Sequence, residues 1–357
     1  MLLKRVSLAN VRSYDLASFD VDPHVTLVLG PNGSGKTTIL EAVYLLMRGT
    51  SFRGRDRDVV AYGRDALEAK LELDDMPVRR VRLGTGPEER IVKAFTVADS
   101  NSARLAQKDR LPVVLFEPDE LRLLSSSPQR RRDFLDGIIA RLSPTYSAVL
   151  SRFGRALLQR NELLKQHEAM NATDWQNHLF AWDVKFAELS ASIIKARTNF
   201  IVHANQHLSR IYSELAGADH VVTARYVTPF PVVDDSLHQS LLHKLEASRR
   251  MDAVRGFTSV GPHRDDLELS LDTHAAAESA SRGEMRTIML AFKLLEVELQ
   301  EHHSGLRPLI LLDDVFSELD TTREGRLMHA LKDHQTIITA TDLRDELKID
   351  ATVISLG

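Results

Sequence analysis

The sequence predicts an α/β fold, with a mixed sheet and an antiparallel β layer, interrupted by an α-helical lobe. Residues 25–29 form a short apolar run that leads into a glycine-rich loop and an amphipathic helix. Residues 309–312 form a second apolar run, which ends in two aspartates. Between these runs, residues 128–217 carry apolar side chains at helical spacing with almost no glycine or proline. The chain therefore begins and ends as α/β, with helices between.

Length and composition predict a globular chain with two folded parts. At 357 residues the chain exceeds the usual size of one hydrophobic core, so we expect an α/β domain in residues 1–125 and 250–357 and a helical insertion in residues 126–249. Hydrophobic residues make up 43% and charged residues 27%, and no run approaches the length of a membrane span. The absence of cysteine and of an N-terminal secretory signal predicts a cytoplasmic protein without disulfides. With a net charge of −4, nucleic-acid binding would have to come from local basic surface.

The glycine-rich loop is a complete phosphate-binding motif. Its glycines permit a tight turn that aims backbone N–H groups at phosphate oxygens, and the following helix N-terminus adds partial positive charge. We expect Lys36 to reach the β- and γ-phosphates and the Thr37 hydroxyl to ligate Mg²⁺. A glycine-rich turn without a ligand is the weaker alternative, because a strand and a helix flank the loop. The motif predicts a nucleoside triphosphate bound by Gly30, Pro31, Asn32, Gly33, Ser34, Gly35, Lys36, Thr37 and Thr38.

An antiparallel β layer is predicted after the first helix. Residues 67–73 alternate strictly between apolar and polar side chains, residues 81–83 do so briefly, and residues 91–97 are rich in apolar side chains. A further apolar run at residues 111–116 predicts another buried strand, with Pro112 tolerated near its start.

The inserted lobe is predicted to contain a helical hairpin. A capping box, Thr173 with Gln176, predicts the start of a long helix whose apolar seam continues to Leu215. Comparable spacing from Leu150 to Leu164 predicts a partner helix before it. Both tryptophans lie on the seam, which favours a packing face over a role in nucleotide stacking.

After residue 256 the pattern returns to α/β. Strands are predicted at residues 267–271, 309–312, 336–340 and 351–355, and a helix at residues 285–299.

Two aspartates follow the apolar strand at residues 309–312. This arrangement completes a phosphate-binding loop by holding Mg²⁺ at the carboxyl end of the strand. We expect Asp313 to hold the metal or its water, and Asp314 to position and polarise the attacking water. Asp314 and Lys36 are thus the predicted catalytic residues. A helix cap or a turn is the alternative explanation of the aspartate pair.

The segment Ser281-Arg282-Gly283 precedes the helix at residues 285–299. Its hydroxyl, amides and helix dipole suit an anion, although any capped helix has these features. The order of phosphate loop, insertion, this segment, the aspartate pair and Asp320 resembles the ABC-type ATPase head of SMC-like proteins. The resemblance implies that Ser281, Arg282, Gly283 and Asp320 act in trans, so that two heads close around two ATP molecules.

Within that superfamily the chain resembles the RecF family of bacterial DNA replication and repair proteins over essentially its whole length. The resemblance is carried by residues 10–14, 30–42, 49–53, 116–121, 130–136, 261–267, 281–283 and 311–320, above all by the string Gly261-Pro-His-Arg-Asp-Asp266. It implies an ATP-dependent, DNA-binding homodimer with weak, DNA-stimulated ATPase activity. It further implies recognition of gapped, junction or duplex DNA, cooperation with RecO and RecR in loading RecA, and a position near the nucleotide for Arg12 and Ser13.

Some positions depart from the family pattern. Glu284 stands where the family usually has glutamine, and its carboxylate would repel a nearby γ-phosphate. Residues 338–342 offer hydroxyls and an acid where ABC heads often carry a switch histidine, so no γ-phosphate sensor is assigned. For His263 and Arg264, a buried histidine and a salt-bridged arginine are favoured over contact with a ligand.

Basic clusters are the candidates for DNA contact. Arg53, Arg55 and Arg57 form one cluster, and Arg80 with Arg82 would share one face of a strand. Local ion pairs with acidic neighbours explain each cluster equally well. No aromatic residues interleave the clusters, which favours contact with the duplex backbone over base stacking.

Two other classes of protein would also carry a phosphate loop. The long helical insertion and the absent switch histidine disfavour the ATP-binding subunit of a membrane transporter. A small-molecule P-loop kinase would not need the segment Ser281-Arg282-Gly283.

Overall fold

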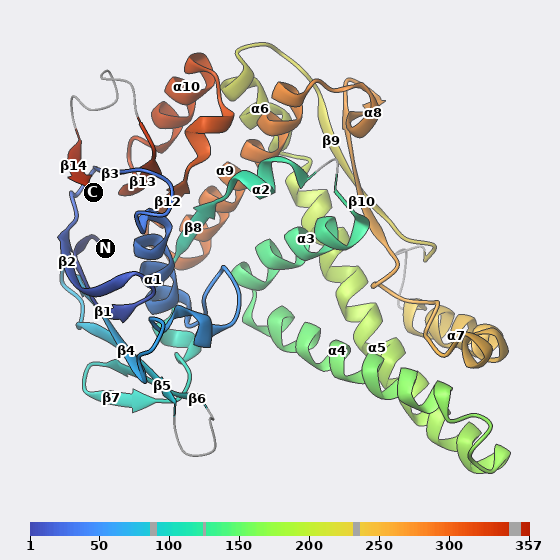
Figure 1. Ribbon diagram of the computed structural model, residues 1–357. Helices are drawn as coiled ribbons and strands as arrows, with labels where there is room; N and C mark the ends of the chain where they lie inside the picture. The colour runs from blue at the N-terminus through green and yellow to red at the C-terminus, as the bar shows by residue number, and fades with distance from the viewer. Residues whose placement is uncertain (86–90, 124–125, 231–235, 343–350) are drawn as a thin grey trace. The chain divides into compact units, whose positions relative to one another are not determined.

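The computed structural model describes residues 1–85, 91–123, 126–230, 236–342 and 351–357 of the chain (Figure 1). These residues form two compact units. Unit 1 comprises Met1–Glu120 and Glu296–Gly357 and contains the phosphate loop. Unit 2 comprises Leu121–Leu295 and contains the helical lobe.

A parallel sheet in unit 1 carries the phosphate loop. The strands Val113–Phe116, Leu309–Asp313 and Thr336–Ala340 are buried along nearly their whole length, as expected of a parallel sheet with both faces covered. Each strand was predicted from its apolar run, and the parallel pairing confirms the α/β class. In spatial order the strands are β14 (Thr352–Ser355), β3 (Val25–Leu29), β13 (Thr336–Ala340), β12 (Leu309–Asp313) and β8 (Val113–Phe116).

An antiparallel sheet forms the second layer of unit 1. In β4 the residues Leu67, Ala69, Leu71 and Leu73 are buried, as the strict alternation predicts. They share one apolar core with the parallel strands and with helix α1 (Lys36–Arg48), which lies beside both sheets in Figure 1. The hairpin of β1 and β2 was not predicted. In spatial order the strands are β2 (Tyr14–Asp20), β1 (Leu3–Val11), β4 (Ala66–Leu73), β5 (Arg79–Thr85), β6 (Ile91–Val97) and β7 (Ser100–Ser102).

Further helical elements lie wholly or partly in unit 1. Helix α9 begins in unit 2 and ends in unit 1, and α2 crosses the boundary at its last residue. These elements are η1 (Asp56–Val59), η3 (Gln107–Asp109), α2 (Pro118–Leu121), α9 (Arg282–Ser304), η5 (Val315–Glu318) and α10 (Thr321–Leu331).

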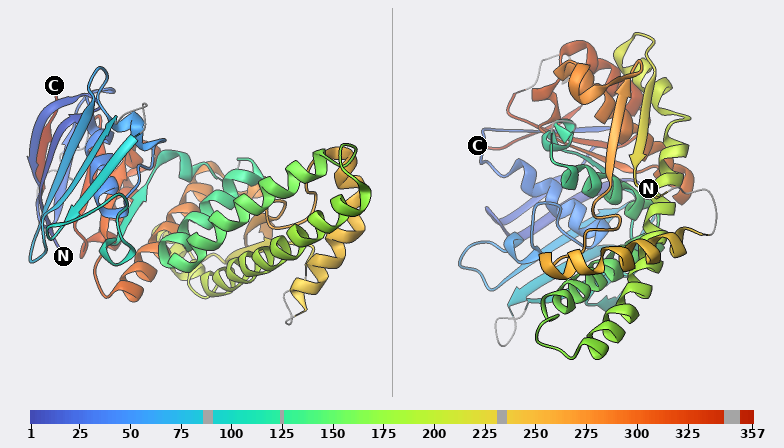
Figure 2. Two further views of the ribbon diagram at one scale, coloured as in Figure 1. Left: turned by 90° about the horizontal axis from the view of Figure 1, so that it is seen from below. Right: turned by 90° about the vertical axis from the view of Figure 1, so that its right-hand side faces the viewer.

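Unit 2 is built mainly from helices (Figure 2). Helices α4 and α5 form the predicted hairpin, in which the Phe153 and Phe186 rings lie 5.0 Å apart and Trp175 Nε1 donates to the Leu163 carbonyl at 2.8 Å. The seam is therefore a packing face. The helices are α3 (Pro128–Leu142), α4 (Pro144–Lys165), α5 (Ala172–Ala204), α6 (Leu208–Ala216), α7 (Leu237–Arg255) and α8 (Ala276–Ser279), and the antiparallel strands are β9 (Val222–Val227), β10 (Asp266–Leu271) and β11 (His274–Ala275).

The prediction of one helix from Thr173 to Leu215 is wrong at both ends. Asn171 is the N-cap, and its side chain accepts from the Thr173 N–H at 2.9 Å, so Thr173 does not form the cap. The helix ends at Ala204 because the Asn205 side chain turns to the backbone of Ala224 in β9. It donates to the Ala224 carbonyl at 2.9 Å and accepts from the Ala224 N–H at 2.7 Å. An asparagine that pairs with a strand in this way interrupts the helical ladder.

The boundary between the two units after the helical insertion differs from the expected domain boundary at residue 250. Residues 250–295, expected in the α/β domain, lie in unit 2. Strand β10 pairs with β9, and the fully buried Arg160 of α4 binds Asp183, Asp252 and Thr258. These contacts tie the residues after 250 to the helical lobe.

No helix in the described part of the chain combines the length and the hydropathy that a membrane span requires.

Candidate nucleotide-binding site

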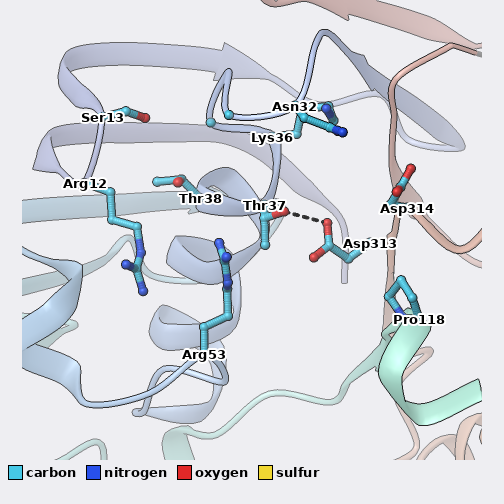
Figure 3. Close-up of a pocket in the computed structure, with 12 residues that line it drawn as sticks. Arg12, Ser13, Asn32, Lys36, Thr37, Thr38, Arg53, Pro118, Asp313 and Asp314 are labelled. Carbon is cyan, nitrogen blue, oxygen red and sulfur yellow. Dashed lines mark hydrogen bonds between the residues drawn. The ribbon is translucent and has the colours of Figure 1, made fainter. Parts of the chain in front are cut away.

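A cavity of about 350 Å³ lies over the phosphate loop, entirely within unit 1 (Figure 3). The loop after β3, the start of α1, the end of β12 and two arginine-bearing segments contribute to it. Its lining residues are Arg12, Ser13, Asn32, Gly33, Gly35, Lys36, Thr37, Thr38, Arg53, Pro118, Asp313 and Asp314.

The loop backbone needs glycine at two positions. Gly33 and Gly35 have φ values of 87° and 99°, which L side chains rarely adopt. A Cβ at position 35 would lie 2.9 Å from both Ser13 Oγ and the Tyr14 ring. Ser13 therefore borders the loop and lines the cavity, and its position near a nucleotide stays a prediction.

Lys36 is folded back onto the loop that precedes it. Its ammonium donates to the Gly30 carbonyl at 2.7 Å and the Pro31 carbonyl at 2.9 Å. Of the predicted loop residues, Gly30, Pro31 and Ser34 do not line the cavity. Gly30 and Pro31 instead hold Lys36 through their carbonyls.

Thr37 and Asp313 lie in direct contact, although they come from α1 and β12. The Thr37 hydroxyl donates to Asp313 Oδ1 at 2.8 Å, and this bond is drawn in Figure 3. A hydroxyl and a carboxylate are the oxygen donors that Mg²⁺ prefers. Among the described residues no cluster of three or more acidic or histidine side chains could hold a metal alone. A site that shares its metal with substrate phosphates fits this donor set.

Thr339 at the end of β13 is a further site residue, which the sequence did not reveal. Its buried hydroxyl donates to Asp313 Oδ1 at 2.8 Å and accepts from the Asp314 N–H at 3.1 Å. Thr339 falls in residues 338–342, where no γ-phosphate sensor could be assigned. A threonine in a buried strand has no distinguishing sequence signal, so only its partners identify it.

Asp314 adopts a backbone conformation that is uncommon for a non-glycine residue. Its φ is 51°, and such conformations persist at functional sites where surrounding contacts enforce them. Its N–H donates to the Thr339 carbonyl at 3.1 Å, and the Ser317 hydroxyl donates to its carbonyl at 2.7 Å. Partial burial raises the pKa of Asp314, with the Asp313 charge adding to the effect and Lys36 opposing it.

Arg12 and Arg53 reach the cavity from two separate segments (Figure 3). Arg12 lies after β1 and forms a bidentate ion pair with the fully buried Glu41. Arg53 lies in the loop after α1. The arginine cluster proposed for DNA is thus divided, because Arg53 faces the cavity over the phosphate loop.

The other predicted DNA contacts form exposed ion pairs or local turns. Arg80 and Arg82 share one strand face as predicted, and both pair with Glu68. Arg57 pairs with Asp58 at 3.4 Å, and the Arg55 N–H donates to the same carboxylate at 3.3 Å. The local ion-pair alternative is therefore present at Arg57, Arg80 and Arg82, and a DNA role for the four arginines stays a prediction.

The segment predicted to act in trans lies at the start of α9. The Ser281 N–H donates to Glu284 Oε2 at 2.7 Å, and the Glu284 N–H donates to Ser281 Oγ at 3.3 Å, which is a reciprocal capping box. In unit 2, Arg282 lines a second cavity, of about 500 Å³. Asp320 is the N-cap of α10 and accepts from the Arg323 N–H at 2.9 Å.

Residues in the segment 261–266 contact other residues of unit 2. Gly261 has a φ of 125°, and a Cβ there would lie 2.9 Å from the Phe186 ring. His263 bonds the Thr258 carbonyl at 3.0 Å, and burial lowers its pKa to about 4. Asp265 accepts from the Tyr226 hydroxyl, and Asp266 pairs with Arg131 at 2.6 Å. A structural role for His263 is therefore supported.

Known proteins resemble this chain over nearly its whole length. A family model described as the RecF/RecN/SMC N terminal domain matches residues 2–347. A DNA replication and repair protein RecF from Gloeobacter violaceus is 34% identical, over 96% of this chain and 92% of that protein. A solved structure of the recombination mediator protein RecF-ATP in the RecFOR pathway has a TM-score of 0.84 and 29% identity, over 96% of this chain and 93% of that one.

A more distant structure shares the fold. The Smc head domain from Pyrococcus furiosus, at 18% identity, has a TM-score of 0.51 over 99% of this chain and 93% of that one. The two layers of unit 1 and the phosphate loop after β3 agree with this ATPase-head architecture. The chain belongs to the RecF family of DNA replication and repair proteins.

Proposed function

We propose that the chain binds ATP with Mg²⁺ over the phosphate loop and hydrolyses it slowly, with stimulation by DNA. The observation that carries this proposal is the cavity in which Lys36, Thr37 and Asp313 converge. A phosphate loop and a strand-end carboxylate in contact form the minimal arrangement for phosphoryl transfer from a nucleotide. The RecF relative solved with ATP supports the choice of nucleotide.

Four residues that line the cavity each have one part in the proposed reaction. Lys36 exchanges its bonds to the loop carbonyls for bonds to the β- and γ-phosphates. Thr37 and Asp313 hold Mg²⁺, whose charge neutralises phosphate oxygens when it is bound. Asp314 positions the attacking water and accepts its proton.

Arg12 and Arg53 bind phosphate oxygens of the same nucleotide. Both line the cavity, and guanidinium groups suit phosphate because they present several N–H donors in a fixed plane. We therefore assign Arg53 to the nucleotide in preference to DNA.

ATP binding is proposed to bring two copies of the chain together. In this dimer Ser281, Arg282, Gly283 and Asp320 of one copy cover the nucleotide of the other. Ser281 and Arg282 are exposed at the start of α9, which is a condition for such a role. The Glu284 carboxylate in the capping box opposes a partner's phosphates, which predicts a weak dimer and slow turnover.

The proposed role of the dimer is to hold gapped or duplex DNA in the cytoplasm and to assist RecA loading with RecO and RecR. The description of the RecF-ATP relative as a recombination mediator in the RecFOR pathway supports this role. Arg55, Arg57, Arg80 and Arg82 are the proposed DNA contacts. The ion pairs of Arg57, Arg80 and Arg82 are at least partly exposed, so each is worth only about 0–1 kcal/mol and can be exchanged for DNA phosphates.

The proposal is tested by measuring DNA binding and oligomeric state on the same samples, with and without Mg-ATP, at two salt concentrations. We expect Mg-ATP to increase both dimer formation and affinity for gapped DNA, and Lys36→Ala to abolish both increases. A chain that binds no ATP, or binds DNA equally without it, would refute the proposal.

A further inference from the structure

We propose that Glu41 is a positioning residue for the nucleotide: its carboxylate orients Arg12 directly and the Arg53 loop through Ser51. This inference rests on the proposed binding of ATP in the cavity. Arg12 and Arg53 line that cavity, whereas Glu41 and Ser51 do not.

Glu41 is a buried carboxylate on the helix that also carries Thr37. It lies one helical turn beyond Thr37 in α1, so the two side chains share a helix face. Its carboxylate is completely buried. A buried carboxylate is costly unless charged and polar partners compensate it, and both of its oxygens have such partners.

The first partner is Arg12, which approaches Glu41 with the edge of its guanidinium. Arg12 Nε donates to Glu41 Oε2, and Arg12 Nη2 donates to Glu41 Oε1 at 2.7 Å. Of the five N–H groups of the guanidinium, three remain for a ligand in the cavity. The Arg12 backbone has a φ of 45°, and its N–H donates to the Val59 carbonyl at 2.9 Å. The backbone and the side chain of Arg12 are thus both fixed, so its remaining N–H groups point in a defined direction.

The second partner is Ser51, which connects Glu41 to the Arg53 loop. Ser51 Oγ donates to Glu41 Oε1 at 2.5 Å and accepts from the Arg53 N–H at 3.0 Å. The Ser51 N–H donates to Asp56 Oδ1 at 2.8 Å, and Lys93 binds the other oxygen of Asp56 at 2.6 Å. The loop is therefore anchored on both sides of Arg53.

One carboxylate thus holds the Arg12 side chain and, through Ser51, the backbone of the loop that carries Arg53. Because Glu41 and Arg12 neutralise each other, Arg12 contributes directed hydrogen bonds more than net charge to the cavity. Loss of the Glu41 charge would leave Arg12 cationic but no longer oriented. The expected consequence is weaker ATP binding, even though the cavity becomes more positive.

The test is a double-mutant cycle on Mg-ATP affinity, measured by calorimetry on the full chain. Glu41→Gln keeps the shape of the side chain and should weaken ATP binding about tenfold, as expected for lost charge-assisted hydrogen bonds. In an Arg12→Ala background the same substitution should cause a clearly smaller weakening, because only the connection through Ser51 to the Arg53 loop remains. If Arg12→Ala does not fold, Arg12→Lys replaces it, since lysine pairs with Glu41 but lacks the planar fork.

The Ser51 connection is tested by a second cycle. Ser51→Ala should weaken ATP binding in the parent chain and have no effect in an Arg53→Ala background. Thr50→Ala is the matched control, because its neighbouring hydroxyl makes only long bonds to the Ser51 carbonyl and Asp56 and does not contact Glu41. This variant should bind ATP as the parent does.

The outcomes separate this inference from the proposed function. Glu41→Gln with parental ATP affinity, or with the same loss in both backgrounds, overturns the inference and leaves ATP binding intact. A parent chain that binds no ATP overturns the proposed function itself.

Discussion

Thr37 and Asp313 are separated by 276 positions in the sequence, yet the Thr37 hydroxyl donates a 2.8 Å hydrogen bond to the Asp313 carboxylate. Strands β3 and β12 both pair in parallel with β13, so their carboxyl ends meet at one edge of the sheet. The phosphate loop follows β3, and the aspartate pair ends β12. The sheet topology therefore assembles one site from two motifs.

Asp314→Asn should keep ATP binding and prolong the ATP-bound dimer. Asparagine tolerates the positive φ at this position and retains the volume of the side chain, but it cannot accept a proton from water. We expect ATP hydrolysis to fall by about a hundredfold or more, a hundredfold being roughly the lower end of a general-base contribution. Size-exclusion chromatography after ATP addition measures the lifetime of the dimer. Dimers that dissociate as fast as those of the parent would contradict the assigned role.

Thr339→Val should weaken the Mg²⁺-dependent binding of ATP. The substitution removes the donor to Asp313 and one of the two acceptors for the Asp314 N–H, while it keeps the shape of the side chain and the Thr339 carbonyl. Loss of a hydrogen bond to a charged group predicts about tenfold weaker Mg²⁺-dependent ATP binding. Thr339→Ser is the control, since it keeps the hydroxyl. Equal behaviour of the two variants in a magnesium titration would exclude a role for the hydroxyl.

Arg160→Leu should strongly destabilise unit 2. Removal of this buried arginine leaves Asp183 and Asp252 buried without their shared cation, which predicts a loss of about 3–5 kcal/mol in the free energy of unfolding. Arg249→Leu is a matched control, because Arg249 contacts the same Asp183 from a more exposed position and should cost about 1 kcal/mol. Urea unfolding measures both variants. Similar losses of unfolding free energy in the two variants would show that the complete burial of Arg160 with Asp183 and Asp252 is not the cause.

His263 should make stability depend on pH. Burial lowers its pKa from 6.5 to about 4, so the unfolded chain binds the proton more readily between these values. The stabilisation from neutral His263 is present at neutral pH and is lost as the pH falls below 6.5, by about 2 kcal/mol between pH 7 and pH 5. Urea unfolding of the parent and of His263→Gln at both pH values tests this. An equal loss in both proteins would assign the dependence to other groups.

The parts of the site that were predictable are encoded in short, contiguous segments. Apolar runs gave the parallel strands, and the glycine spacing gave the loop with Lys36 and Thr37. Because parallel strands align their carboxyl ends, the aspartates after β12 could be assigned to the same site.

The parts that were missed depend on partners far away in the sequence. Glu41 has the sequence appearance of an ordinary helix residue, and only its pairing with Arg12, 29 positions earlier, gives it a role. Thr339 is likewise identified by its contact with Asp313. The break of the long helix at Asn205 depends on Ala224 in β9, which no helical pattern contains. Such pairings arise from tertiary structure, so local propensity does not predict them.

The central claim, that each copy of the chain covers the nucleotide of another, is tested most directly by sedimentation of Ser281→Arg with saturating Mg-ATP, with bound nucleotide measured on the same sample. The account predicts a monomer that retains parental ATP affinity, because the added side chain blocks only the partner's site. A variant that still dimerises as the parent does, or a monomer that has lost ATP binding, would contradict the claim.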